Sequence, residues 1–119
     1  MRHPFEHEKI VIEYILGLAG ISADVSSWVV APVQDGGMGS LRFAPLDDGR
    51  VFGSQVAECH FYDVDGVAVS IALNADQAGQ WFELDVWRVD FHPTLGWPPL
   101  VELHAGPPGE GSPRPRGRT

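Results

Sequence analysis

The spacing of apolar residues predicts one helix near the N-terminal end of the chain. Between residues 10 and 18 they recur at intervals of three and four, which places them along one stripe of a helix. Glu6 and Glu8 favour the positive end of the helix dipole, and Pro4 suits a first turn. Gly20 can end the helix with a left-handed cap. The pattern therefore predicts a helix over residues 5–19.

From Ser27 onward the pattern changes to β-branched and aromatic runs that are separated by turns. The runs expected as strands are residues 28–33, 41–43, 51–62, 67–73 and 80–91. The segments between them are rich in Gly, Asp and Asn, and the glycines of residues 36–39 are expected to allow positive φ in a tight connection. Short turns join antiparallel strands. The prediction is an α+β fold, with one N-terminal helix packed on an antiparallel β-meander of four to five strands.

The C-terminal sequence differs in composition from the rest of the 119 residues. Beyond Leu103 it consists mainly of Gly, Pro, Ser and Arg, and no apolar residue follows Ala105. Such a segment buries too little surface to offset the entropy of ordering it. We therefore expect a single domain over residues 1–103 and a disordered tail over residues 104–119. The arginines of the tail suit an acidic surface or RNA, but a solvated end without a role is the simpler interpretation.

The charge of the chain restricts the class of partner. The formal net charge is −8, and the segment after Leu103 carries three arginines against one glutamate, so residues 1–103 carry −10. Binding to nucleic acid is not expected, because it needs clustered Lys and Arg. An acidic body attracts basic protein partners over long range, although the same charge also keeps a small protein soluble.

Membrane insertion and disulfide chemistry are not expected either. No apolar run approaches the roughly 18 residues of a membrane span, and the first residues lack the apolar core of a signal peptide. Cys59 is the single cysteine, which excludes an internal disulfide and a cysteine-cluster zinc site. These features indicate a cytoplasmic protein.

Strand alternation predicts which side chains share a face of the sheet. In residues 80–91, Phe82, Leu84 and Val86 suit the face beneath the helix, and the residues between them point the other way. If the two longest strands are in register, the open face carries carboxylates and aromatic rings together: Glu58, His60, Tyr62, Trp81, Glu83, Asp85 and Trp87. A slip of one residue would reverse this assignment.

This open face has two chemical interpretations. As a binding surface it would use Tyr62, Trp81, Glu83, Asp85 and Trp87, because tryptophan rings anchor interfaces and carboxylates attract cations. As a catalytic site it would use the candidates Glu58, His60, Glu83 and Asp85. Glu83 and Asp85 lie about 7 Å apart on one strand face, and His60 is a further proton carrier.

Other catalytic and metal-binding patterns are weak. Cys59 and His60 are strand neighbours that point to opposite faces, so a buried structural thiol is favoured over a Cys–His pair. The spacing of Asn74, Asp76 and Asp85 resembles a calcium loop, but Ala78 occupies a ligand position and no helix is expected to follow. No P-loop lysine or nucleophile elbow is present. We expect no metal and no cofactor.

Four sequence strings carry a resemblance to a known family. They are DGGMGSLRF at residues 35–43, E-x-x-F-x-D-x-D-G-V at residues 58–67, L-N-x-D at residues 73–76 and ELDVWRVDF at residues 83–91. Together they resemble a small single-domain bacterial family of unknown function, over residues 5–98. The resemblance implies no activity and no catalytic residue. Such domains are similar in build to the immunity proteins of toxin systems, which is an analogy of architecture only.

Three functions remain open from the sequence. The first is an acidic binding domain, immunity-type or adaptor, that clamps a basic protein partner. The second is a small enzyme that uses the Glu, Asp and His side chains of the open face. The third is a structural subunit that associates with itself through the edge strand containing Trp28, so both a monomer and a homodimer are compatible with the sequence.

Overall fold

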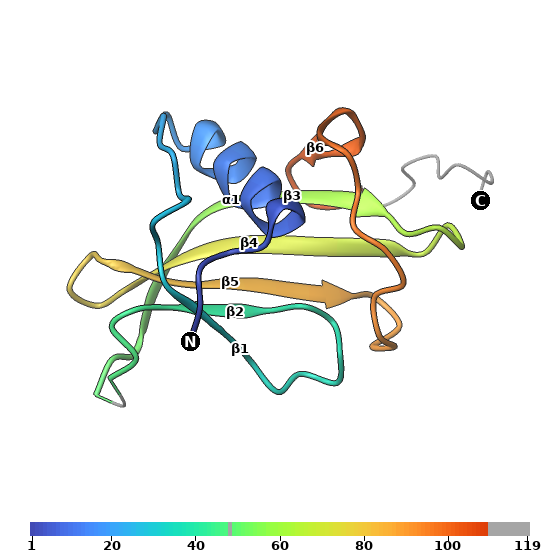
Figure 1. Ribbon diagram of the computed structural model, residues 1–119. Coiled ribbons are helices and arrows are strands. Elements are labelled where there is room, and N and C mark those ends of the chain that lie inside the picture. Colours follow the sequence, from blue (N-terminus) through green and yellow to red (C-terminus); the bar gives the residue numbers. More distant parts are fainter. Residues whose placement is uncertain (48, 110–119) are drawn as a thin grey trace.

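The computed structural model describes residues 1–47 and 49–109 and consists of one helix and six strands (Figure 1). The helix α1 spans Glu6–Leu18, within one residue of the prediction at each end. The strands are β1 (Val30–Pro32), β2 (Leu41–Phe43), β3 (Phe52–Tyr62), β4 (Ala68–Asp76), β5 (Trp81–Arg88) and β6 (His104–Ala105). A single 3-10 turn, η1, covers Leu100–Glu102. The α+β class is confirmed, with six strands instead of four to five.

The ends of α1 follow from local chemistry. At its start, Glu8 accepts a hydrogen bond from the Phe5 amide at 2.8 Å and pairs with Arg2 at 2.7 Å. At its end, Gly20 takes a φ of 82° and donates its amide to the Gly17 carbonyl. No helix within the described ranges has the length and apolar character that a membrane crossing needs.

All paired strands are antiparallel, in the order β1-β2-β5-β4-β3-β6. β3, β4 and β5 form the predicted meander, and β1 and β2 form a hairpin. The hairpin pairs with β5 through Leu41 opposite Leu84, so the connection after β2 carries the chain across the sheet to β3. The outer edge of β1 is partly covered, because Arg2 and Val30 exchange backbone hydrogen bonds of 2.9 and 2.7 Å.

Three predicted boundaries were wrong. β4 continues through Asn74 to Asp76, which the composition had assigned to a turn. β5 ends at Arg88, because the Phe91 amide closes a turn onto the Arg88 carbonyl at 2.8 Å. Residues 104–106, expected in the tail, lie along β3 instead, since backbone pairing needs no apolar side chain. The predicted disorder of residues 110–119 lies outside the described residues.

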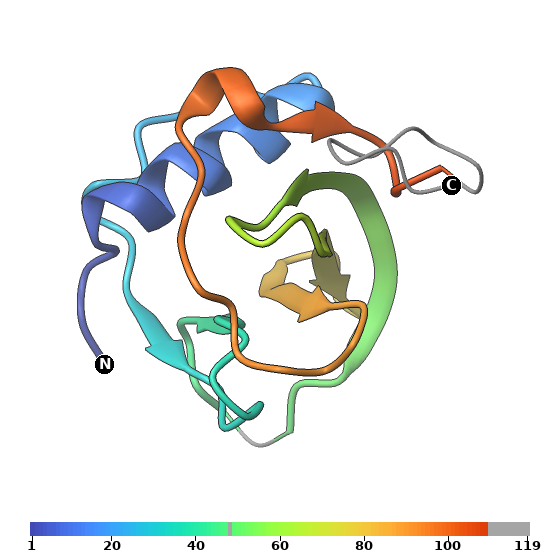
Figure 2. The ribbon, with the colours of Figure 1, turned by 90° about the vertical axis from the view of Figure 1, so that its right-hand side faces the viewer.

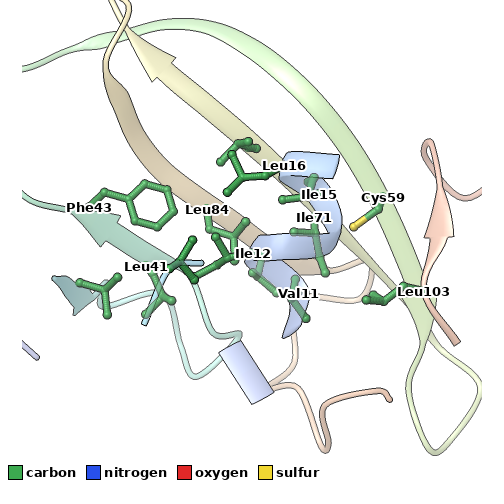
Figure 3. Packing of buried hydrophobic residues seen from close by; sticks show 14 of the residues in the cluster. Val11, Ile12, Ile15, Leu16, Leu41, Phe43, Cys59, Ile71, Leu84 and Leu103 are labelled. Carbon is green, nitrogen blue, oxygen red and sulfur yellow. The ribbon is translucent and has the colours of Figure 1, made fainter. Parts of the chain in front are cut away.

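The hydrophobic core lies between α1 and one face of the sheet (Figure 3). It is built from buried side chains of the helix and of the strands, among them Val11, Ile12, Ile15, Leu16, Leu41, Phe43, Cys59, Ile71, Leu84 and Leu103. Cys59 is fully buried, as predicted, and burial raises the pKa of its thiol to about 12. The thiol is therefore part of the packing and stays protonated.

The connections at one end of the sheet close over this core (Figure 2). The segment after β5 crosses that end and returns to α1, where Trp97 packs against the core cluster and its ring lies 5.1 Å from that of His7. Gly39 has a φ of 113°, and an added Cβ there would lie 2.7 Å from the Trp97 ring. The prediction that this glycine-rich loop uses positive φ is confirmed by Gly36, Gly37 and Gly39.

Candidate binding site on the open face of the sheet

The sheet face opposite α1, which we call the open face, carries side chains from the three central strands. Cys59, Ile71 and Val86 are aligned across β3, β4 and β5 and point into the core, so the residues next to them point outward. The register places Glu58 and Asp85 on either side of Ala72. The next row places His60 and Trp87 on either side of Ser70, and Asn74 lies beside Glu83. The structure thus brings Glu58, His60, Tyr62, Glu83, Asp85 and Trp87 to one face.

The prediction for Trp81 was wrong. β5 carries an extra residue at this point, because Asn74 is opposite Glu83 while the next residue, Ala75, is opposite Trp81. This bulge reverses the alternation. Trp81 packs against the core cluster, and with Trp28 and Phe43 it lines a cavity of about 460 Å³.

The same bulge changes the surroundings of Phe82, which was expected beneath the helix. The Phe82 ring lies under two guanidinium groups, with the Cζ atoms of Arg42 and Arg50 at 4.3 and 5.4 Å from its centre. Arg50 also pairs with Asp76 at 2.9 Å and donates to the carbonyls of Phe43 and Pro45. Phe82 therefore contributes to fixing arginines rather than to the core under α1.

The carboxylates of the open face differ in their partners. Glu83 accepts from the Asn74 amide at 3.1 Å and lies 3.6 Å from the Arg42 guanidinium. Among residues 1–47 and 49–109, the hydrogen-bond partner of the Asp85 carboxylate is the Ser40 hydroxyl, at a long 3.4 Å. Burial of Asp85, together with the negative charge of Glu83, raises the pKa of its carboxyl. No basic side chain of the described residues forms an ion pair with this carboxylate.

Glu58 is held by neutral groups as well. Its two oxygens accept from the Ser70 hydroxyl at 3.2 Å and the Gln55 amide at 3.1 Å. The strand spacing separates the backbones of Glu58 and Asp85 by about 10 Å, with the small side chain of Ala72 between them. Within the described ranges, neither carboxylate has a basic partner. The arrangement suits an incoming cation.

His60 ties the C-terminal strand to the open face. Its Nδ1 lies 2.8 Å from the Gly106 carbonyl oxygen and therefore donates to it. Its ring contacts those of Tyr62 and His104, with centroids 5.6 and 5.2 Å away. The Gly106 amide donates to the Glu58 carbonyl at 2.8 Å. In the described part of the chain, His60 is thus bonded to backbone and not to the candidate carboxylates.

A second polar cluster, not expected from the sequence, lies at the end of the sheet. Arg88 is buried and donates to three aspartates, Asp63, Asp65 and Asp90, at 2.8–3.1 Å. The signal was present in two strings, D-V-D-G and R-V-D-F, in which charged and apolar residues alternate at the ends of strands. By local pattern the first string predicts a turn and the second a strand, and neither pattern indicates that the two strings pair with each other.

The described ranges contain no group of three or more His, Cys, Asp or Glu side chains that is suited to hold a metal ion. Asp76, part of the calcium-like spacing, instead accepts from the Ala78 and Gln80 amides at 2.9 Å and pairs with Arg50.

Comparison with known proteins places the chain in a family. Neither the curated proteins nor the solved structures gave a significant match. A family profile matches residues 1–98, which is most of the chain and agrees with the resemblance over residues 5–98. The chain belongs to the family described as Domain of unknown function (DUF6984).

Proposed function

We propose that this domain binds a basic protein partner through the open face, as an immunity-type or adaptor protein. The observation that carries the proposal is the pair Glu58 and Asp85, which lie across Ala72 and, among the described residues, receive hydrogen bonds from neutral groups alone. A lysine or arginine of a partner would supply the missing positive charge. Trp87, in the adjacent row, would provide an aromatic anchor beside it.

The distribution of charge supports the same partner class. Residues 1–103 contain five basic side chains, and each of them already pairs with a carboxylate of this chain: Arg2, Lys9, Arg42, Arg50 and Arg88. The excess negative charge is therefore left for an external partner. Such a field raises the rate of association with basic proteins and weakens with salt.

We favour binding over catalysis because the candidate groups do not form a proton-transfer pair. His60 is buried with Nδ1 engaged by a carbonyl, and Cys59 lies on the other face. Self-association through β1 is also less well supported, since Arg2 already occupies part of that edge.

The test is affinity capture with the full chain from a lysate of the source organism at low and high salt. We expect a positively charged protein to be captured by the wild type and to be lost with Glu58→Gln/Asp85→Asn and with Trp87→Ala. Glu6→Gln/Asp24→Asn removes the same number of charges near α1 and should retain capture. A partner that is captured equally by all variants, or one whose binding ignores salt, would contradict the proposal.

A further inference from the structure

The end of the sheet near Arg88 has an inverted distribution of polarity. Charged groups lie inside, since the side chains of Arg88 and Asp63 are 5% and 1% exposed. Apolar side chains next to them lie outside: Val64 is 81% exposed, Phe91 73%, Leu95 60% and Val89 49%. We call these four residues the tip patch. Folding normally buries apolar groups and leaves charges in water, so this arrangement needs a reason beyond folding.

The buried ion pairs fix the backbone that carries the tip patch. Val64 lies between Asp63 and Asp65, and Val89 and Phe91 flank Asp90. All three aspartates bind the one guanidinium of Arg88. The Leu95 amide also donates to Asp63, at 2.7 Å.

This cluster joins the β3–β4 hairpin to the segment after β5. Both lie at the right-hand end in Figure 1, and that end faces the viewer in Figure 2. The four apolar side chains are therefore carried on a pre-organised frame, which lowers the entropy lost on binding.

Phe91 gives a second, independent sign. Phe91 has a φ of 62°. In the described part of the chain, every other residue with a positive φ is a glycine. A large aromatic residue is unfavourable there, and its exposed ring gains little packing in return. Strain of this kind is retained where the surrounding structure enforces it and is concentrated at functional positions.

The charges around the tip patch indicate which class of partner can bind there. The side chains of Asp65 and Asp90 are 40% and 36% exposed, and three carboxylates share one guanidinium, which leaves a charge of −2. A second copy would bring the same acidic rim and another net charge of −8. An anionic membrane surface would be repelled as well. A partner that buries these apolar groups must carry positive charge around its own apolar contact.

We propose that the tip patch is a docking surface for a protein segment whose bulky apolar side chains are flanked by lysine or arginine. The tip patch and the open face have no residue in common, so the inference does not depend on the proposed function. Val64, Phe91 and Leu95 supply the apolar contacts, and Asp65 and Asp90 pair with the flanking cations.

The test selects phage-displayed random peptides of about 16 residues on the full chain. We expect enrichment of peptides with bulky apolar residues next to Lys or Arg. Their affinity should fall about tenfold or more with Phe91→Gly and with Val64→Ser, as expected for loss of a central apolar contact. Phe52→Ser removes another exposed phenylalanine, at the other end of the sheet, and should leave affinity unchanged, as should Glu83→Gln/Asp85→Asn on the open face.

Several results would overturn the inference. One is a selection that enriches no peptides, or that enriches acidic peptides. Another is that the selected peptides bind the Phe91→Gly variant as tightly as the wild type, once the unfolding curve of the variant shows that it is folded. A dimer detected by light scattering that requires Phe91, or Phe91-dependent binding to phosphatidylcholine vesicles, would assign the patch to a different occupant and would also overturn it.

Discussion

At the scale of single residues, several side chains of this domain are in positions that stability alone does not favour. Asp85 is partly buried with no basic partner in the described part of the chain, and Phe91 combines a positive φ with an exposed ring. Asp85 belongs to the open face and Phe91 to the tip patch, the two surfaces that we propose for binding. A function that needs a particular side chain explains why a residue is kept where a different one would be more stable.

Phe91 allows this argument to be tested by stability measurements. Glycine accepts a φ of 62° without strain, whereas alanine does not. We expect Phe91→Gly to be more stable than Phe91→Ala by about 1 kcal/mol, and at least as stable as the wild type. Urea unfolding of the three proteins measures the difference. If the alanine variant were the more stable of the two, the strain that we assign to Phe91 would not exist.

At the scale of elements, local pattern was sufficient for much of the fold. The apolar stripe located α1, and strand alternation placed Glu58, His60, Asp85 and Trp87 on one face. The features that the local pattern does not predict, the bulge in β5 and the end of that strand, depend on contacts between distant segments. The bulge that moves Trp81 into the core arises from pairing with β4, and the end of β5 depends on Arg88 meeting aspartates from another hairpin.

The strand β6 is the clearest case of this limit. Its sequence is polar and precedes two prolines, so composition assigned it to a tail. The structure pairs His104 with His60 and Ala105 with Cys59. The Gly106 amide donates to the Glu58 carbonyl, and the Gly106 carbonyl accepts from the His60 ring. Backbone pairing of this kind carries no hydrophobic signal, which is why sequence alone placed the domain boundary at residue 103.

Two truncations test the boundary. A chain that ends after Leu103 loses β6, whereas a chain that ends after Gly109 retains it. Each intramolecular hydrogen bond contributes about 1 kcal/mol net, so we expect the shorter chain to be less stable by about 1–3 kcal/mol. Urea unfolding of the two chains provides the comparison. Coincident unfolding midpoints would show that β6 is dispensable.

At the scale of the whole molecule, ion pairs couple stability to pH. Hydrogen bonds from Arg88 hold the pKa of Asp65 and Asp90 below its usual range, and backbone amides together with Arg50 lower the pKa of Asp76. On acidification the unfolded chain takes up these protons before the folded protein does. Stability from these groups is therefore complete above about pH 5 and is lost as the pH falls below about 4.

The pKa of Asp85 is shifted upward, whereas the pKa values of Asp65, Asp76 and Asp90 are shifted downward. Asp85 therefore affects the pH dependence of stability in the opposite sense. Because burial and Glu83 raise its pKa, the folded protein binds this proton more tightly than the unfolded chain does. Ionised Asp85 therefore destabilises the fold at neutral pH, and the penalty disappears on protonation. We expect Asp85→Asn to increase stability at pH 7 by less than about 1 kcal/mol, and to have little effect below about pH 3.5, where Asp85 is itself neutral.

Asp35 provides the matched control, since it lies near Asp85 but is held differently. Burial alone would raise the pKa of Asp35, but the amides of Ser40 and Met38 outweigh that effect and lower it. Asp35→Asn should accordingly reduce stability at pH 7, the reverse of Asp85→Asn. Urea unfolding of both variants and the wild type at pH 7 and pH 3.5 measures the direction of each stability change. If Asp85→Asn were destabilising at neutral pH, the carboxylate would be a structural group, and the main argument for a cation-binding face would fail.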